Sequence, residues 1–100
     1  MVRLSNPQNY ELIGFEKNNG KKFKYDAILK NKKTGELRRI PFGGKYPDGT
    51  PYEHYRDQIG AYSKYDHNDE KRRSLYRKRH KGEEKHLYSS GYFSWFYLWM

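Results

Sequence analysis

The chain has 100 residues, a formal net charge of +9 and no cysteine. This length suits one small domain with a thin core, and the lack of cysteine excludes disulfide scaffolds and thiolate metal sites. The N-terminus lacks the apolar run of a signal peptide, and no segment approaches the ~18 apolar residues of a membrane span. We therefore expect an unsecreted protein without a membrane span, whose core uses the aromatic residues that make up 18% of the chain.

The order of patterns along the chain predicts an α+β fold, in which a small three-stranded antiparallel β-meander packs with a basic α-helix and a short aromatic C-terminal helix. We expect residues 1–9 to form an N-terminal arm and residues 10–100 to form a single small domain. Within this domain the expected elements are the sheet over residues 10–42, a long loop over 43–65, the basic helix over 69–80 and the aromatic segment over 89–99.

Two strands are predicted from Tyr10 to Glu16 and from Lys22 to Lys30, on either side of the turn-forming residues Asn18-Asn19-Gly20. In the second strand apolar and charged residues alternate, which is typical of a sheet with one buried and one wet face. The expected buried set is Phe23, Tyr25, Ala27 and Leu29, and the expected wet set is Lys22, Lys24, Asp26 and Lys30. A bulged turn at Gly35 leads to a third strand that runs from Leu37 to Phe42.

Prolines, glycines and five tyrosines occupy the segment between the sheet and the basic helix. The prolines and glycines interrupt every helical or strand period, so we expect a long loop with a short helical turn near residues 53–59. The tyrosines argue against disorder. They indicate that the loop wraps over the sheet.

The basic helix has plausible signals at both ends. Asp66 or Asn68 is expected to cap its start, and Gly82 lies beyond its end. Its apolar content is low, so Leu75 and Tyr76, extended by the side-chain stems of Arg72 and Arg79, form the expected inward stripe.

The aromatic segment is expected to be a helix capped by Ser89 or Ser90. Apolar residues occur on nearly every side of it, which predicts burial against the sheet or against another molecule. Its candidates for a protein interface are Tyr92, Phe93, Phe96 and Trp99. Exposure of these residues as a patch of several hundred Å² would favour protein interaction over nucleic-acid binding.

The basic helix carries more cations than its narrow inward face can hold, so several must face out together. Outward cations of this density suit the phosphates of a nucleic acid. The candidate phosphate contacts are Arg72, Arg73, Arg77, Lys78 and Arg79, supported by Lys22 and Lys24 of the first hairpin. A helix that is merely solvated, or one that meets an acidic protein surface, is the alternative interpretation.

No enzyme is indicated by the motifs. The four histidines lack the spacing and the partner ligands of a metal site, so neither a metal nor another cofactor is expected. Asp66-His67-Asn68 superficially matches the active histidine and asparagine of ββα-metal nucleases, but helix capping explains Asn68. Gly43-Gly44-Lys45 lacks the spacing of a phosphate loop, and no catalytic residues are assigned.

Several pieces of the sequence in this order resemble a family of small basic proteins of giant nucleocytoplasmic DNA viruses, with shorter relatives in tailed phages. The pieces are Phe42-Gly43, Tyr52-Glu53-His54-Tyr55-Arg56-Asp57, Asp66-His67-Asn68-Asp69 with Lys71-Arg72-Arg73, Tyr76, Arg79-His80, and Tyr92-Phe93-Ser94-Trp95 with Leu98-Trp99. The resemblance covers about Lys22 to Trp99 and implies a viral origin, with a place in the virion or in the viral factory of the host cytoplasm or nucleus. It implies no catalytic residues.

These observations predict a non-enzymatic protein that binds nucleic acid, with duplex DNA favoured, without strong sequence preference. It would be virion-associated or would condense a genome. The alternative is a minor capsid or cement protein whose arginines meet an acidic virion protein, and a metal-dependent nuclease is the weaker third interpretation. The oligomeric state does not follow from the sequence.

Overall fold

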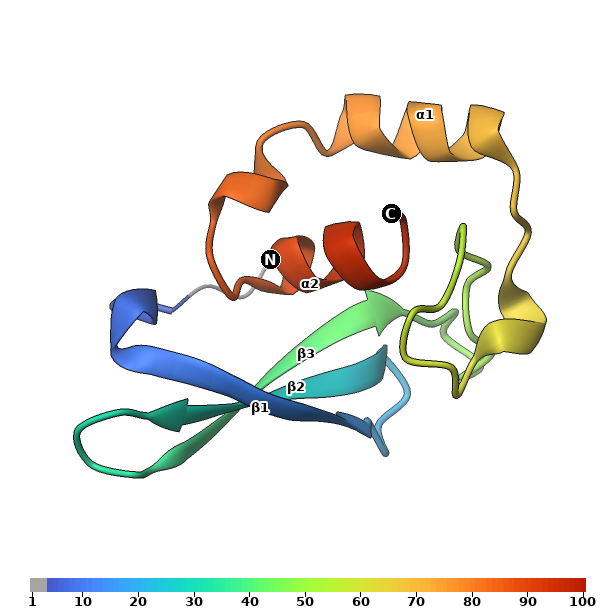
Figure 1. The fold of residues 1–100 in the computed structure, drawn as a ribbon. Coiled ribbons are helices and arrows are strands. Elements are labelled where there is room, and N and C mark those ends of the chain that lie inside the picture. Colours follow the sequence, from blue (N-terminus) through green and yellow to red (C-terminus); the bar gives the residue numbers. More distant parts are fainter. Residues whose placement is uncertain (1–3) are drawn as a thin grey trace.

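A computed structural model describes residues 4–100 of the chain. It confirms the α+β fold, with a three-stranded antiparallel sheet in the order β1-β2-β3. The sheet carries α2 on one face, and α1 lies over α2 as the outermost layer (Figure 1). The strands are β1 (Tyr10–Lys17), β2 (Phe23–Asn31) and β3 (Leu37–Gly44), and the helices are α1 (Glu70–Arg79) and α2 (Ser90–Tyr97). Short 3₁₀ helices lie at Pro7–Asn9, Ser63–Tyr65 and Glu83–Lys85.

The core forms on the face of the sheet that α2 covers. Tyr25 pairs with Phe42 and Ala27 pairs with Ile40, so their side chains share this face. The buried cluster consists of Tyr25, Ala27, Leu29, Ile40, Phe42, Tyr62, Phe93 and Leu98. The prediction of an aromatic core is therefore confirmed for Tyr25 and its neighbours, whereas Phe23, at the start of β2, is only half-buried.

The turns differ in how well the sequence predicted them. Gly35 has a φ of 76°, as expected for the turn between β2 and β3. The connection between β1 and β2 is longer than a two-residue turn, and neither Asn19 nor Gly20 has a positive φ. Instead the Asn18 side chain accepts a hydrogen bond from the Gly20 amide at 2.7 Å.

The loop after β3 closes one end of the sheet (Figure 1). The expected helical turn at residues 53–59 is wrong, because Asp57 organises this segment with side-chain hydrogen bonds instead. Tyr55 and Tyr62 are buried and anchor the loop, whereas Tyr46 and Tyr52 are exposed and pack on each other.

Both helices begin at side-chain caps. Asp69, and neither Asp66 nor Asn68, caps α1 by accepting hydrogen bonds from the amides of Lys71 and Arg72 at 2.9 and 3.3 Å. Asn68 instead has a left-handed backbone with a φ of 52°. Ser89 caps α2 as expected, since its hydroxyl accepts from the Tyr92 amide at 3.0 Å.

Residues 1–3 of the predicted N-terminal arm lie outside the described residues. Within the described part, Leu4 packs against the core cluster, and the Asn9 carbonyl accepts a hydrogen bond from the Lys32 amide at 2.8 Å. This stretch therefore adds contacts to the sheet.

Candidate functional site

The inward face of α1 differs from the predicted one. Tyr76 faces the protein as expected, but Leu75 is 48% exposed. The stems that pack inward belong to Arg73 and Arg77. The helix has no buried residue, so three long side chains dock it in place of an apolar stripe.

Arg73 and Arg77 bind the end of the chain. Arg73 Nη1 donates to the main-chain oxygen of Met100 at 2.8 Å, and the Arg73 guanidinium lies 4.6 Å from the centre of the Tyr55 ring. The Arg77 guanidinium lies 5.4 Å from the Trp95 ring. These cation–π contacts occupy two of the five arginines and lysines that were predicted to touch phosphates.

The remaining three candidates on α1 face solvent. Lys78 and Arg79 are exposed and belong to none of the ion pairs among the described residues. Arg72 is also exposed, but it pairs with Glu53 at 3.1 Å. Lys71 and Lys81 add two further exposed cations at the two ends of the helix.

The two lysines predicted from the first hairpin, Lys22 and Lys24, lie in different environments. Lys22 is exposed. Lys24 is 2% exposed, so its expected place on the wet face of the sheet is wrong and it does not belong to a phosphate-binding surface. The alternation failed here because the loop around His54 covers the end of β2.

Lys24 belongs to a buried chain of polar groups. Its Nζ lies 2.9 Å from His54 Nδ1, and His54 Nε2 lies 2.6 Å from Asp66 Oδ1. A charged Lys24 can only donate, so His54 accepts at Nδ1 and donates from Nε2 to the carboxylate. Burial, followed by the charge of Lys24, lowers the pKa of His54 and keeps its ring neutral, although Asp66 opposes this effect.

Asp57 forms a second buried anchor beside this chain. Its carboxylate accepts hydrogen bonds from the Tyr25 hydroxyl and from the amides of Ile59, Gly60 and Tyr62. Burial alone would raise the pKa of Asp57, but these bonds outweigh burial and lower it. The carboxylate therefore stays ionised and fixes the loop to β2.

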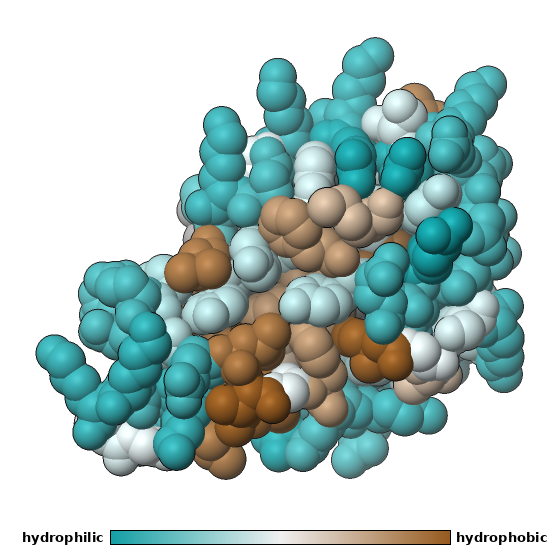
Figure 2. Space-filling view, viewed as in Figure 1, coloured by the Kyte–Doolittle hydropathy of each residue, from teal (hydrophilic) through white to brown (hydrophobic). Residues whose placement is uncertain are grey.

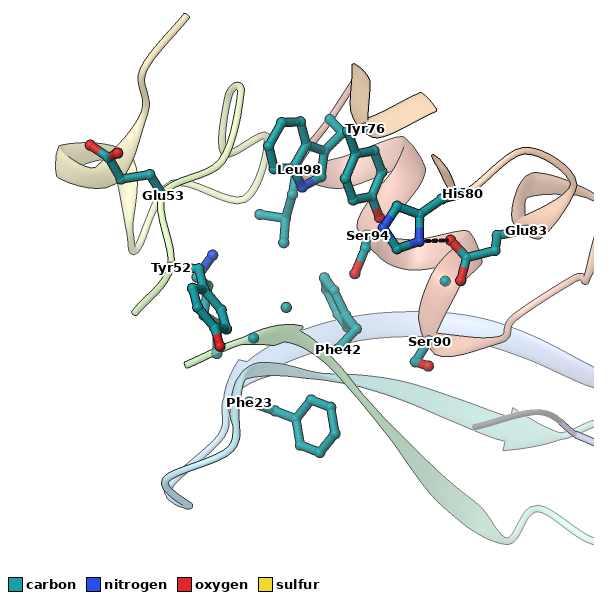
Figure 3. Close-up of a pocket in the computed structure, with 15 residues that line it drawn as sticks. Phe23, Phe42, Tyr52, Glu53, Tyr76, His80, Glu83, Ser90, Ser94 and Leu98 are labelled. Atoms are coloured by element: carbon teal, nitrogen blue, oxygen red, sulfur yellow. Dashed lines mark ion pairs between the residues drawn. The ribbon is translucent and has the colours of Figure 1, made fainter. Parts of the chain in front are cut away.

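A cleft of about 330 Å³ opens between the end of the sheet, the loop and the two helices (Figure 3). Phe23 lies on the sheet side and Tyr52 on the loop side, while Tyr76 approaches from α1, His80 from the C-cap of this helix and Ser94 from α2 (Figure 3). Other lining residues are Lys24, Glu53, Glu83, Leu98 and Trp99. These side chains come from segments that lie far apart in the sequence.

The wall on the helix side is a stack of rings. Tyr76 lies between Trp99 and His80, with ring centres 4.2 Å apart on each side and interplanar angles of 2° and 25°. Burial raises the pKa of Tyr76, and Glu83 adds to this effect, so its hydroxyl stays protonated beside Ser94. This stack holds α1 over α2 and shapes the cleft.

Two glycines keep the opposite wall open. A Cβ atom at Gly44 would lie 2.6 Å from Tyr52 Cδ2, and one at Gly43 would lie 2.9 Å from Leu98 Cδ1. Gly43 also has a φ of 74°, which side chains disfavour. The backbone at the end of β3 therefore approaches Tyr52 and Leu98 more closely than another residue would allow.

The aromatic segment serves mostly as core. Of the four interface candidates, Phe93 is fully buried, and Tyr92, Phe96 and Trp99 are half-buried. The expectation that Phe93 is available to a partner is therefore wrong. Figure 2 shows hydrophobic side chains gathered over α2 and β1, beneath the hydrophilic layer of α1.

The nuclease-like residues have structural roles. His67 Nδ1 accepts from the Asp69 amide at 2.9 Å, and Asn68 accepts from Arg56. Across residues 4–100 no three His, Asp or Glu side chains are placed to hold a metal ion. No helix in this part of the chain is long and apolar enough to cross a membrane.

No protein-family model, curated protein or solved structure matches the chain. The site is therefore defined by its geometry alone. Sequence reasoning found the outward cations of α1 but missed the cleft and the buried chain of Lys24, His54 and Asp66. The paired glycines at the end of β3 were the available signal for the cleft, but they also fit a simple turn.

Proposed function

We propose that the protein binds nucleic acid without strong sequence preference, through the exposed cations of α1. The supporting observation is the charge of this outermost helix, in which six Lys and Arg residues accompany one Glu. Two of the six are used internally, and Arg72 is paired with Glu53, which leaves Lys71, Lys78 and Arg79 facing solvent. Cations arranged in this way release counterions when they meet phosphates, so binding falls with salt.

A virion-associated or genome-condensing role in a viral factory remains part of this proposal. The minor capsid alternative has less support, because Phe93 and Leu98 of the aromatic segment are buried in the core. The nuclease alternative also has less support, because its candidate residues His67 and Asn68 form hydrogen bonds with Asp69 and Arg56.

Salt-titrated binding to a short duplex DNA tests the proposal. A triple variant with Lys71→Gln, Lys78→Gln and Arg79→Gln is expected to bind more weakly and to lower the slope of log affinity against log salt by about 2 to 3, since each lost phosphate contact removes roughly 0.9. The matched control replaces three exposed lysines at the end of β2 and in the turn that follows it, with Lys30→Gln, Lys32→Gln and Lys33→Gln.

Both variants lose the same net charge, so they separate a local contact surface from a general effect of charge. Retention of wild-type affinity and slope by the control supports binding by α1. Equal losses in the two variants, or wild-type binding that does not change with salt, would contradict it.

A further inference from the structure

The proposed contacts with phosphates use the outer face of α1 and leave the cleft beneath this helix without a role. Its volume of about 330 Å³ falls at the lower end of the range of small-ligand sites, roughly 300 to 1,000 Å³. Tyr76 of α1 lines the cleft, and the exposed Arg72 of the same helix pairs with the lining residue Glu53 at 3.1 Å. A cation of α1 therefore lies at the margin of the cleft, where the phosphate of a nucleotide in the cleft would meet it.

We propose that this cleft accepts the base of an unpaired nucleotide whose phosphates are held by the cations of α1. The inference rests on the proposed function, because it takes nucleic acid as the ligand. It adds that the protein prefers single strands or unpaired positions to a closed duplex, since a paired base cannot leave its stack without an energetic cost.

The aromatic lining provides the stacking surface. Both faces of Tyr76 are covered by Trp99 and His80, so this ring supports the wall. Tyr52 is 42% exposed and rests on Gly44 and on Tyr46, which leaves ring surface for a ligand. Stacking of a base on such a ring adds affinity and tolerates any base.

The polar lining suits the edge of a base. Glu83 lines the cleft, and its Oε2 lies 2.6 Å from His80 Nδ1, which holds the carboxylate in place. A carboxylate accepts through two oxygens, so it can also accept from the exocyclic amino group of a base. The Ser94 hydroxyl lines the same space and can either donate or accept.

A cationic guest fits less well, although aromatic rings and carboxylates often bind cations. Arg72 already neutralises Glu53 at 3.1 Å, and the Lys24 side chain lines the cleft. The whole protein also carries a net charge of +9, which repels cations and attracts nucleotides. The charge distribution therefore favours a neutral base attached to an anionic backbone.

Nuclear magnetic resonance of ¹⁵N-labelled protein tests the proposal, with cytidine 5′-monophosphate as the probe and ribose 5-phosphate as the base-free control. Gly43, Gly44 and Gly91 line the cleft, and their amide resonances are expected to shift with the nucleotide and not with the sugar phosphate. Tyr52→Ala is expected to abolish these shifts. Leu37→Ala, which removes an exposed apolar side chain at the opposite end of β3 from Gly43 and Gly44, is expected to retain them.

The results separate this inference from the proposed function. Equal glycine shifts with the two probes, no glycine shifts at all, or equal effects of Tyr52→Ala and Leu37→Ala would overturn the base site, whether or not duplex DNA binds to α1. Nucleotide-specific shifts in a protein that binds no duplex or single-stranded DNA would leave the cleft as a nucleotide site and overturn the proposed function. A second readout is oligocytidine affinity at fixed salt, which Tyr52→Ala should lower about tenfold while duplex affinity stays unchanged.

Discussion

Lys24 Nζ and His54 Nδ1 lie 2.9 Å apart in the interior, and neither residue is more than 2% exposed. An isolated buried ammonium group would be strongly destabilising. Here the carboxylates of Asp57 and Asp66 lie close enough to favour the charged amine, and His54 accepts its hydrogen bond. This contact joins β2 to the loop that forms one wall of the cleft.

Stability should depend on pH through Lys24. Burial lowers the pKa of Lys24 from 10.5 to about 8, although Asp57 and Asp66 oppose the change. Between these two values the unfolded chain holds more protons than the folded protein, so the free energy of unfolding rises with pH, by up to about 3 kcal/mol. Below about pH 8 this contribution is lost. Urea denaturation of the wild type and of Lys24→Met from pH 7 to pH 10 should show the rise in the wild type only.

The neighbouring Lys22 provides the control for that experiment, because it is exposed. Lys22→Met should follow the pH dependence of the wild type. Parallel curves for the wild type and Lys24→Met would contradict the lowered pKa of the buried amine.

Asp57→Asn should loosen the loop. The substitution replaces a carboxylate that accepts four hydrogen bonds with an amide that has one acceptor oxygen. We expect a loss of about 3 kcal/mol in the free energy of unfolding, measured by denaturant titration. Asp48→Asn, in an exposed turn where the side chain accepts from Thr50, should leave the unfolding midpoint nearly unchanged. Similar effects of both substitutions would argue against an anchoring role for Asp57.

Gly43→Ala should destabilise the protein more than Gly49→Ala. Both glycines have a positive φ, 74° and 89°, so the backbone cost of adding a Cβ is similar. Only at Gly43 does the new atom meet packed neighbours, with Leu98 Cδ1 at 2.9 Å, whereas nothing lies within 4 Å at Gly49. We expect the difference in unfolding free energy to be about 1 to 3 kcal/mol. Equal destabilisation by thermal or denaturant unfolding would show that Leu98 moves aside freely.

Tyr76→Ala should detach α1. The ring packs between Trp99 and His80, while the adjacent Leu75 is 48% exposed. Because α1 has no buried residue, removal of this ring should cost about 2 to 3 kcal/mol and expose the helix amides to hydrogen exchange. Leu75→Ala should change neither stability nor exchange appreciably. Preserved protection of α1 in Tyr76→Ala would mean that Arg73 and Arg77 suffice to hold the helix.

The successes of sequence reasoning follow from local rules. Alternation in β2 predicts the burial of Tyr25, Ala27 and Leu29, because a strand repeats every two residues. Ser89 was one of two predicted caps for α2, since its hydroxyl can reach an amide three residues along. These features depend on neighbours in the chain, and for this reason a single sequence reveals them.

The failures occur where a distant segment intervenes. Lys24 has the sequence position of a surface lysine, but His54, thirty residues away, covers it. Asp66 has a side chain that can cap a helix, yet it bonds to the same histidine, so Asp69 caps α1. In each case a hydrogen bond across the fold replaces the local preference.

Periodicity, turn residues and composition act locally, and they are enough to predict the three-stranded sheet, the basic helix, the aromatic core and the excess of positive charge. Which cations remain outside and which residues line the cleft depends on the packing of distant segments. Arg73 and Arg77 turn toward the end of the chain while Lys78 and Arg79 face solvent. That division depends on where α2 and the loop pack, which is set by contacts between residues far apart in the chain.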